Sequence, residues 1–176
     1  MASVARSNIE MKARVSDFAQ CGLIAAELAG GEPQVLNQTD TYFNVRKGRL
    51  KLREDENVCE LIYYERPDVS ETKRSDYDRY PLTSPRQLAR TLHSALGTKV
   101  VVRKQRLVYL HRNVRIHLDT VEGLGHFLEL EAVVDAQTDI SECASRVNEL
   151  LGRFNIKDCD MVASSYCDLL ESARHC

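Results

Sequence analysis

The sequence predicts an α+β protein built from about eight antiparallel strands and about four helices. Several segments alternate strictly between aliphatic and charged residues, which is the period of two expected of a strand with one buried face. Stretches with helical spacing do not separate each strand from the next, so the order does not match repeated βαβ units. The length of 176 residues and the hydrophobic content of 43% fit one folded domain.

The first element is a strand over residues 8–15, in which every second residue is aliphatic. Asp17 and the pair Gly30-Gly31 are typical start and stop signals, so a helix is expected between them. Lys47-Gly48 provides a turn between the next two strands. The remaining strands are expected over residues 39–45, 49–53, 59–65, 74–80, 100–110, 114–121 and 127–134.

Pro85 suits the first position of a second helix, which is expected to end near Gly97. Helical spacing returns over residues 141–151 and 160–173, and the polar residues 69–73 are expected to form a loop. The sequence contains no internal repeat and no linker. We therefore expect a single domain over residues 1–176, with a core from about residue 8 to 170.

The composition excludes several classes of protein. The 24 Lys and Arg nearly balance the 26 Asp and Glu, which argues against a protein that binds nucleic acid or acidic membranes through general basic charge. No stretch approaches the roughly 18 apolar residues of a membrane span, and residues 1–11 lack the apolar core of a secretory signal. The six cysteines contain no CxxC pair. We expect a cytoplasmic protein with reduced thiols.

One face of most expected strands is densely charged. This face could be the hydrated side of an open sheet. It could also line a channel, if the sheet curls so that cations and carboxylates face each other. Buried clusters of like charge are costly without a counter-charge, so such cations would require a polyanion and such carboxylates a hard divalent metal. The cations concerned are Arg49, Lys51, Arg53, Lys104 and Arg106, and the acids are Asp119, Glu129 and Glu131.

Four motifs resemble the CYTH domain, the superfamily of triphosphate tunnel metalloenzymes that includes class IV adenylyl cyclases and thiamine triphosphatases. They are Asn8-Ile9-Glu10-Met11-Lys12, Arg49-Leu50-Lys51-Leu52-Arg53, Lys104-x-Arg106 and Phe127-Leu128-Glu129-Leu130-Glu131. Residues 63–68, 74–77 and 115–125 are similar to the class IV cyclase-like branch. The resemblance implies an eight-stranded antiparallel β tunnel, a closed barrel with a charged interior and flanking helices.

The resemblance also implies roles for individual residues. It assigns Mg²⁺ or Mn²⁺ to Glu10, Asp119, Glu129 and Glu131. It assigns catalysis to Glu10, Lys12, Glu129 and Glu131. The residues that fall where family members hold phosphate oxygens are Lys12, Arg14, Lys51, Arg53, Arg74, Lys104, Arg106 and Arg115.

Two positions depart from the family pattern. Asn8 replaces the first Glu of Glu-x-Glu-x-Lys, which removes one negative charge, and Glu65 stands where many relatives have Lys. Glu129 could instead form an interior salt bridge, and His117 fits an interior hydrogen-bonded residue better than a base. The segment from Ser165 to Leu170 resembles a C-terminal helix that packs against one end of the tunnel.

The expected function is metal-dependent hydrolysis of inorganic tripolyphosphate or of an organic triphosphate such as ATP or thiamine triphosphate. The first alternative is a class IV-type adenylyl cyclase that makes cyclic AMP and pyrophosphate from ATP. The second is a non-catalytic module that binds polyphosphate or nucleotide. We expect no nucleic-acid or membrane partner, and either a monomer or a homodimer.

Overall fold

The structure, a computed structural model, describes residues 6–65, 73–83, 85–134 and 138–174. For residues 6, 7, 73–76 and 85 it describes the backbone alone. In chain order the elements are β1 (Arg6–Arg14), α1 (Phe18–Ala29), β2 (Gln34–Phe43), β3 (Arg49–Glu54), β4 (Cys59–Glu65), β5 (Lys73–Pro81), α2 (Pro85–Leu96), β6 (Thr98–His111), β7 (Val114–Val121), β8 (Gly125–Val133), α3 (Ile140–Arg153), the 3₁₀ turn η1 (Asp158–Asp160) and α4 (Tyr166–Ala173).

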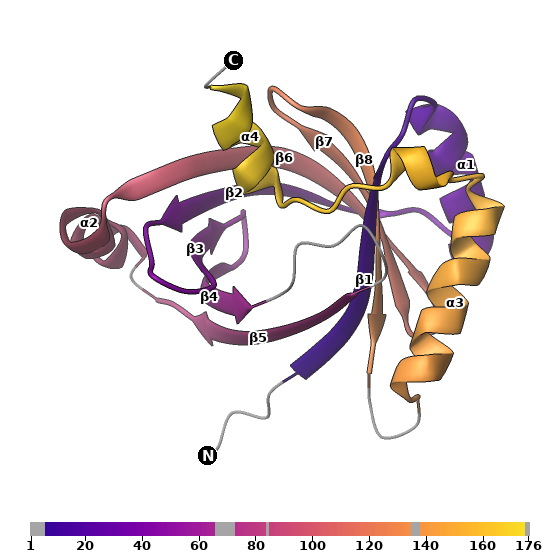
Figure 1. The fold of residues 1–176 in the computed structure, drawn as a ribbon, viewed down its shortest axis with the longest axis horizontal. Coiled ribbons are helices and arrows are strands. Elements are labelled where there is room, and N and C mark those ends of the chain that lie inside the picture. The colour runs from indigo at the N-terminus through magenta and orange to yellow at the C-terminus, as the bar shows by residue number, and fades with distance from the viewer. Residues whose placement is uncertain (1–5, 66–72, 84, 135–137, 175–176) are drawn as a thin grey trace.

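The strands form one antiparallel ring. Their hydrogen-bonded order is β1-β5-β4-β3-β2-β6-β7-β8. The ring closes because β1 pairs with β5 on one side and with β8 on the other. Helices α1 and α3 pack outside the barrel on the side of β1, β7 and β8, and α4 lies against β6 (Figure 1). The structure therefore confirms the predicted α+β fold with an antiparallel β tunnel.

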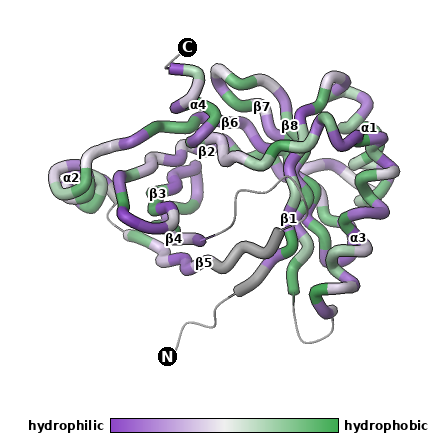
Figure 2. Tube along the Cα trace, in the orientation of Figure 1, coloured by the Kyte–Doolittle hydropathy of each residue, from purple (hydrophilic) through white to green (hydrophobic). Residues whose placement is uncertain are grey.

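Alternation along the strands separates two environments. On β1, Ile9, Met11 and Ala13 point outward into the main core beneath α1 and α3, whereas Glu10 and Lys12 point into the barrel. The same alternation of hydrophobic and hydrophilic residues can be followed along other strands in Figure 2. The outer residues of β7 and β8 belong to the same core, so burial on the outside fixes which side chains face inward.

Local signals explain where individual elements begin and end. The Asp17 side chain accepts a hydrogen bond from the backbone N–H of Gln20 and caps α1. Gly48, in the turn between β2 and β3, has a φ of 66°, and a Cβ there would lie 2.8 Å from the carbonyl oxygen of Tyr64. Only glycine fits this turn without displacing β4.

Two elements differ from the sequence-based expectation. Strand β2 begins at Gln34 and not at Thr39, because its pairing with β6 extends to the start of the strand. The last helix begins at Tyr166 and not at Asp160, because Ser165 and Asp168 form a capping box there. Most of the loop expected over residues 69–73 lies outside the described residues. None of the helices in the described parts of the chain is long and apolar enough to cross a membrane.

Candidate active site

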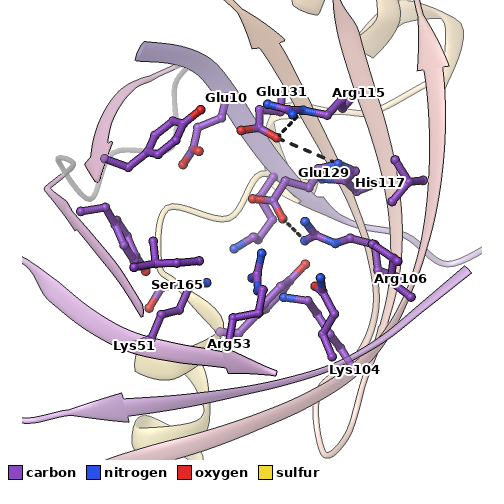
Figure 3. A pocket seen from close by; sticks show the side chains of 18 of the residues that line it. Glu10, Lys51, Arg53, Lys104, Arg106, Arg115, His117, Glu129, Glu131 and Ser165 are labelled. Atoms are coloured by element: carbon purple, nitrogen blue, oxygen red, sulfur yellow. Dashed lines mark hydrogen bonds and ion pairs between the residues drawn. The ribbon is translucent and has the colours of Figure 1, made fainter. Parts of the chain in front are cut away.

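The inner face of the barrel surrounds a cavity of about 380 Å³, which falls within the range of roughly 300–1,000 Å³ typical of ligand pockets. Its charges are segregated (Figure 3). Glu10, Glu131 and Arg115 lie together at one end, and Lys51, Arg53 and Lys104 at the other. The charged residues that line the cavity are Glu10, Lys12, Lys51, Arg53, Arg79, Lys104, Arg106, Arg115, Glu129 and Glu131.

At the basic end, three cations share one carboxylate. Lys51 Nζ lies 2.9 Å and Lys104 Nζ 3.3 Å from Asp40 Oδ2. Arg53 donates hydrogen bonds of 2.7 Å to each of the two Asp40 oxygens. We call these four residues the basic cluster. Because Asp40 is only 1% exposed, its single charge is the buried counter-charge for all three cations.

The shortage of negative charge changes the ionisation of both lysines. Burial, assisted by the charge of Arg53, lowers the pKa of Lys51 to about 7 even though Asp40 opposes the change. Burial lowers the pKa of Lys104 to about 8 against the opposing effect of Asp40. Burial alone would raise the pKa of Asp40, but Arg53, Lys104 and Lys51 hold it well below its usual range. The basic cluster can therefore accept further negative charge, and an incoming anion would return protons to its lysines.

Arg106 occupies the middle of the cavity wall between two carboxylates. Its Nε and one terminal nitrogen lie 2.7 and 2.6 Å from the two oxygens of Asp119, and it lies 2.6 Å from Glu129 Oε2. Tyr166 donates a further hydrogen bond of 2.8 Å to Asp119. Burial alone would raise the pKa of Glu129, but Lys12 and Arg106 hold it well below its usual range. Both acids are therefore negatively charged at neutral pH.

At the acidic end, carboxylates from neighbouring strands lie side by side. Glu10 stands opposite Glu131 in the register of β1 and β8. Asn8 donates a hydrogen bond to Glu131 Oε1, and Arg115 Nε lies 3.1 Å from Glu131 Oε2. We call these four residues the acidic cluster. Burial raises the pKa of Glu131, and the nearby charges of Glu129 and Glu10 raise it further against the effect of Arg115.

Helix α4 closes the barrel beside the basic cluster. The Lys12 ammonium lies 3.8 Å from the centre of the Tyr166 ring, which also contacts Phe127 edge-on at a centroid distance of 4.9 Å. Asp168 fixes the helix by an ion pair of 2.7 Å with Arg49. Through these contacts the segment that begins at Ser165 packs against the barrel, as the sequence indicated.

Comparison with known proteins agrees with this geometry. A sequence profile of the CYTH domain matches residues 6–166. This chain belongs to the CYTH domain family. It is 28% identical over 135 residues to a Methanocaldococcus jannaschii protein named as a candidate adenylate cyclase, a match that covers 76% of this chain and 77% of that protein.

Solved structures share the CYTH fold of this chain. A protein from Pyrococcus horikoshii superposes with a TM-score of 0.79 and 23% identity, covering 92% of this chain and 98% of the other. A candidate adenylate cyclase from Vibrio parahaemolyticus superposes with a TM-score of 0.76 and 20% identity, covering 95% of this chain and 99% of the other. At these identities the likeness concerns the fold.

Two of the site residues predicted from the CYTH resemblance, Arg14 and Asp119, have a different setting from the one expected, and the side chain of a third, Arg74, is not described. Arg14 is exposed, donates a hydrogen bond of 3.0 Å to the carbonyl oxygen of Leu124, and does not line the cavity. Asp119 is a counter-ion of Arg106 and not a member of the acidic cluster, because Arg106 and Tyr166 use both of its oxygens. Arg74 pairs with Ile9 in the register of β1 and β5, and its side chain lies outside the described residues.

The structure also places His117 and the two residues that depart from the family pattern. Glu65 does not reduce the positive charge of the cavity, because it lies on the outer face of β4 and pairs with Lys47 at 2.8 Å. Asn8 lies inside the barrel and is 1% exposed. His117 is 5% exposed, and burial together with Arg106 keeps its pKa well below its usual range. It is therefore a neutral interior residue at pH 7.

Sequence reasoning missed several residues of the inner wall, among them Asp40, Arg79 and Gln38. Asp40 was inside an expected strand but was not recognised as the counter-charge for the basic cluster. Arg79 lines the cavity and pairs with Glu60. Gln38 precedes the strand expected from Thr39, although alternate residues from Gln34 to Tyr42 share the inner face. Extending the period of two backward from Tyr42 could have found Asp40 and Gln38.

The acidic cluster suits a hard divalent cation that takes only a few of its ligands from the protein. The described residues contain no group of three or more His, Cys, Asp or Glu side chains arranged to hold a metal ion. They do contain two adjacent inward carboxylates, Glu10 and Glu131, and the buried oxygen Asn8 Oδ1, which has no hydrogen-bond partner among the described residues. Oxygen ligands of this kind suit Mg²⁺ or Mn²⁺, and Mg²⁺ usually keeps several of its waters.

Proposed function

We propose that this protein is a triphosphate-processing enzyme that binds the phosphate chain of a small molecule inside the barrel and breaks one of its P–O bonds with the help of Mg²⁺ or Mn²⁺. The observation that carries the proposal is the segregation of charge within one cavity. The basic cluster at one end of the cavity offers cations to an anion, and the acidic cluster at the other end offers oxygens to a metal ion. A triphosphate bound to a divalent cation supplies both counter-charges at once.

The cavity residues have separate tasks in this proposal. Lys12, Lys51 and Lys104 contact phosphate oxygens as compact positive charges. Asp40 holds Arg53 in position, and Asp119 and Glu129 hold Arg106. Both guanidinium groups are therefore already oriented when negative charge develops on the phosphate. Glu10 and Glu131, with the Asn8 oxygen, would hold the cation. A divalent cation bound there would neutralise phosphate oxygens and make phosphorus more electrophilic.

The attacking group decides which product forms. Attack by water gives a diphosphate and orthophosphate, whereas attack by the ribose 3′-hydroxyl of ATP gives cyclic AMP and pyrophosphate. We favour hydrolysis, because the charged residues of the cavity suit the phosphate chain itself. Hydrolysis uses water as the nucleophile, whereas cyclisation also requires a ribose hydroxyl on the substrate. Cyclisation is the second candidate. It is supported by the names of the Methanocaldococcus and Vibrio relatives as candidate adenylate cyclases.

A substrate panel tests the proposal. Purified protein is incubated with ATP, thiamine triphosphate or inorganic tripolyphosphate, each with Mg²⁺, Mn²⁺ or EDTA, and orthophosphate, pyrophosphate and cyclic AMP are measured. We expect metal-dependent release of orthophosphate. Cyclic AMP and pyrophosphate without orthophosphate would contradict hydrolysis in favour of cyclisation. Tight binding of all three compounds without any product would instead identify a binding module.

A further inference from the structure

One wall of the cavity is uncharged. Gln34, Leu36 and Gln38 line it from β2, and Val108 lines it from the neighbouring strand β6. Gln34 stands opposite Val108 in the register of the two strands. We call these four residues the neutral wall. Its composition differs from the rest of the described cavity lining, which is dominated by charged and aromatic residues.

The neutral wall adjoins the cations directly. Leu36 stands opposite Arg106, and Gln38 stands opposite Lys104, in the same register. A phosphate chain held by Lys104 would therefore place its next substituent within reach of Gln38 and Leu36. Inorganic tripolyphosphate is charged along its whole length and gains nothing from an aliphatic side chain or a neutral amide at this place.

Gln38 has an unused hydrogen-bonding group. The residue is 6% exposed, and its Oε1 atom has no hydrogen-bond partner among the described residues. A buried amide oxygen without a partner is costly, so a ligand that donates an N–H to it would gain affinity. The terminal torsion of glutamine is soft, which lets this oxygen turn toward the cavity without movement of the strand.

We propose that the neutral wall binds the organic group of an organic triphosphate, and that Gln38 accepts a hydrogen bond from an amine on a heterocyclic ring. This inference rests on the proposed function and narrows it to one substrate class. Leu36 and Val108 cover the face or edge of the ring, and Gln38 provides the polar contact that selects it. The adenine ring of ATP and the pyrimidine ring of thiamine triphosphate both carry such an amine and serve as probes.

Binding measurements test this inference separately from catalysis. Dissociation constants are measured by calorimetry for ATP, thiamine triphosphate, purine riboside triphosphate and inorganic tripolyphosphate. The last two are matched ligands, because purine riboside triphosphate lacks the amine and tripolyphosphate lacks the whole organic group. For the wild-type protein we expect at least one amine-bearing probe to bind about 10-fold or more tightly than both matched ligands.

Variants then locate the contact. Gln38→Leu is expected to reduce the preference for the amine-bearing probe over tripolyphosphate by about 10-fold. Leu36→Ser, at a partly exposed position, is expected to reduce it less. Gln105→Leu is the matched control, because Gln105 is exposed on the outer face of β6, where its side chain donates a hydrogen bond to Asn37. Unfolding temperature and tripolyphosphate affinity show whether each variant is folded.

Each outcome has a distinct meaning. A wild-type protein that binds tripolyphosphate as tightly as both amine-bearing probes would overturn this inference and leave the proposed function intact. An unchanged preference in both Gln38→Leu and Leu36→Ser would also overturn it. Failure of the wild-type protein to bind any of the four compounds, with or without Mg²⁺, would overturn the proposed function itself.

Discussion

The two ends of the cavity are built on the same face of the same sheet, yet they carry opposite imbalances of charge. In the basic cluster, three cations share Asp40, and the pKa values of Lys51 and Lys104 are lowered to about 7 and about 8. In the acidic cluster, Glu10 stands opposite Glu131, and the pKa of Glu131 is raised. The basic cluster therefore carries more positive than negative charge, and the acidic cluster carries more negative than positive charge.

This difference indicates ligand binding and not only structural salt bridging. A barrel stabilised by internal ion pairs would gain most if each cation stood beside its own acid. Arg106 meets that description, since it lies between Asp119 and Glu129. Lys51 and Lys104 do not, because they share Asp40 with Arg53. Their arrangement costs stability in the free protein, and an anion bound beside them would offset this cost.

The largest expected effect follows from removing Asp40. Asp40→Asn leaves three buried cations without their counter-charge, so we expect the free energy of unfolding to fall by about 3–5 kcal/mol. Urea denaturation measures this change, and Asp158→Asn, at an exposed site, is the control. Added tripolyphosphate should restore part of the loss. A variant as stable as the wild type would show that the basic cluster does not depend on Asp40.

Glu129 lies between the two ends, and its loss should affect turnover strongly. Glu129→Gln removes a charge that faces Lys12 and Arg106, and we expect turnover to fall by about 100- to 1,000-fold. Initial rates on the best substrate of the panel measure the effect, and circular dichroism checks folding. The exposed residue Glu149 provides the control substitution Glu149→Gln. An unchanged rate would remove Glu129 from the active site.

Lys104 and Arg103 offer a comparison between the inside and the outside of one strand. Lys104→Met removes an inward cation, and we expect the apparent KM for a triphosphate to rise by about 10- to 100-fold. Arg103→Met removes an exposed cation from the adjacent position of β6 and should change KM by less than about 2-fold. Similar effects of the two substitutions would mean that general charge, and not the basic cluster, attracts the substrate.

Asn8 tests the acidic cluster. Asn8→Asp replaces the hydrogen bond to Glu131 with a third negative charge, which should lower the unfolding temperature in EDTA. The same charge should increase Mn²⁺ affinity by roughly 10-fold, because affinity for hard cations rises with ligand charge. Titration of Mn²⁺ without substrate, followed by electron paramagnetic resonance, measures the binding. Unchanged Mn²⁺ affinity would place the metal site elsewhere.

The smallest expected effect concerns protons. Lys51 has a pKa of about 7 in the free protein, and a bound triphosphate should raise it toward its ordinary value of 10.5. At pH 8 binding should therefore take up about one proton through Lys51 and about half a proton through Lys104, whose pKa in the free protein is about 8, and affinity should decrease as pH rises above about 7. Calorimetry in buffers of different ionisation enthalpy measures the uptake. Lys51→Met should reduce it, and uptake equal to that of the wild type would exclude Lys51 as its source.

The sequence was sufficient to predict the elements and much of the inner face. Alternation predicts the inward residues of most strands, and the resemblance of Asn8–Lys12 and Phe127–Glu131 to a known family predicts the closed barrel. The partners of these residues could not be predicted in the same way. Lys51 and Lys104 meet at Asp40 because β2 lies between β3 and β6, which is a property of the pairing and not of any one strand.

The wrong predictions for single residues also arise from contacts between strands that are distant in sequence. Asp119 faces inward as expected, but it accepts hydrogen bonds from Arg106 on β6 and from Tyr166 on α4. Glu65 departs from the family pattern without consequence for the cavity, because one position along a strand moves a side chain to the other face. Alternation therefore predicts the side of the sheet, whereas the role of a residue depends on contacts between strands that are distant in sequence.

The closure of the ring through β1 also has a consequence for folding kinetics. β1 completes the barrel by pairing with β8, which brings together Asn8 and Glu131 from positions far apart in the chain. Pairings between such distant segments make folding slow. We expect this pairing to form late, so that the cavity charges lose most of their water near the end of folding. Tripolyphosphate, which needs the closed cavity, should therefore slow unfolding more than it accelerates refolding.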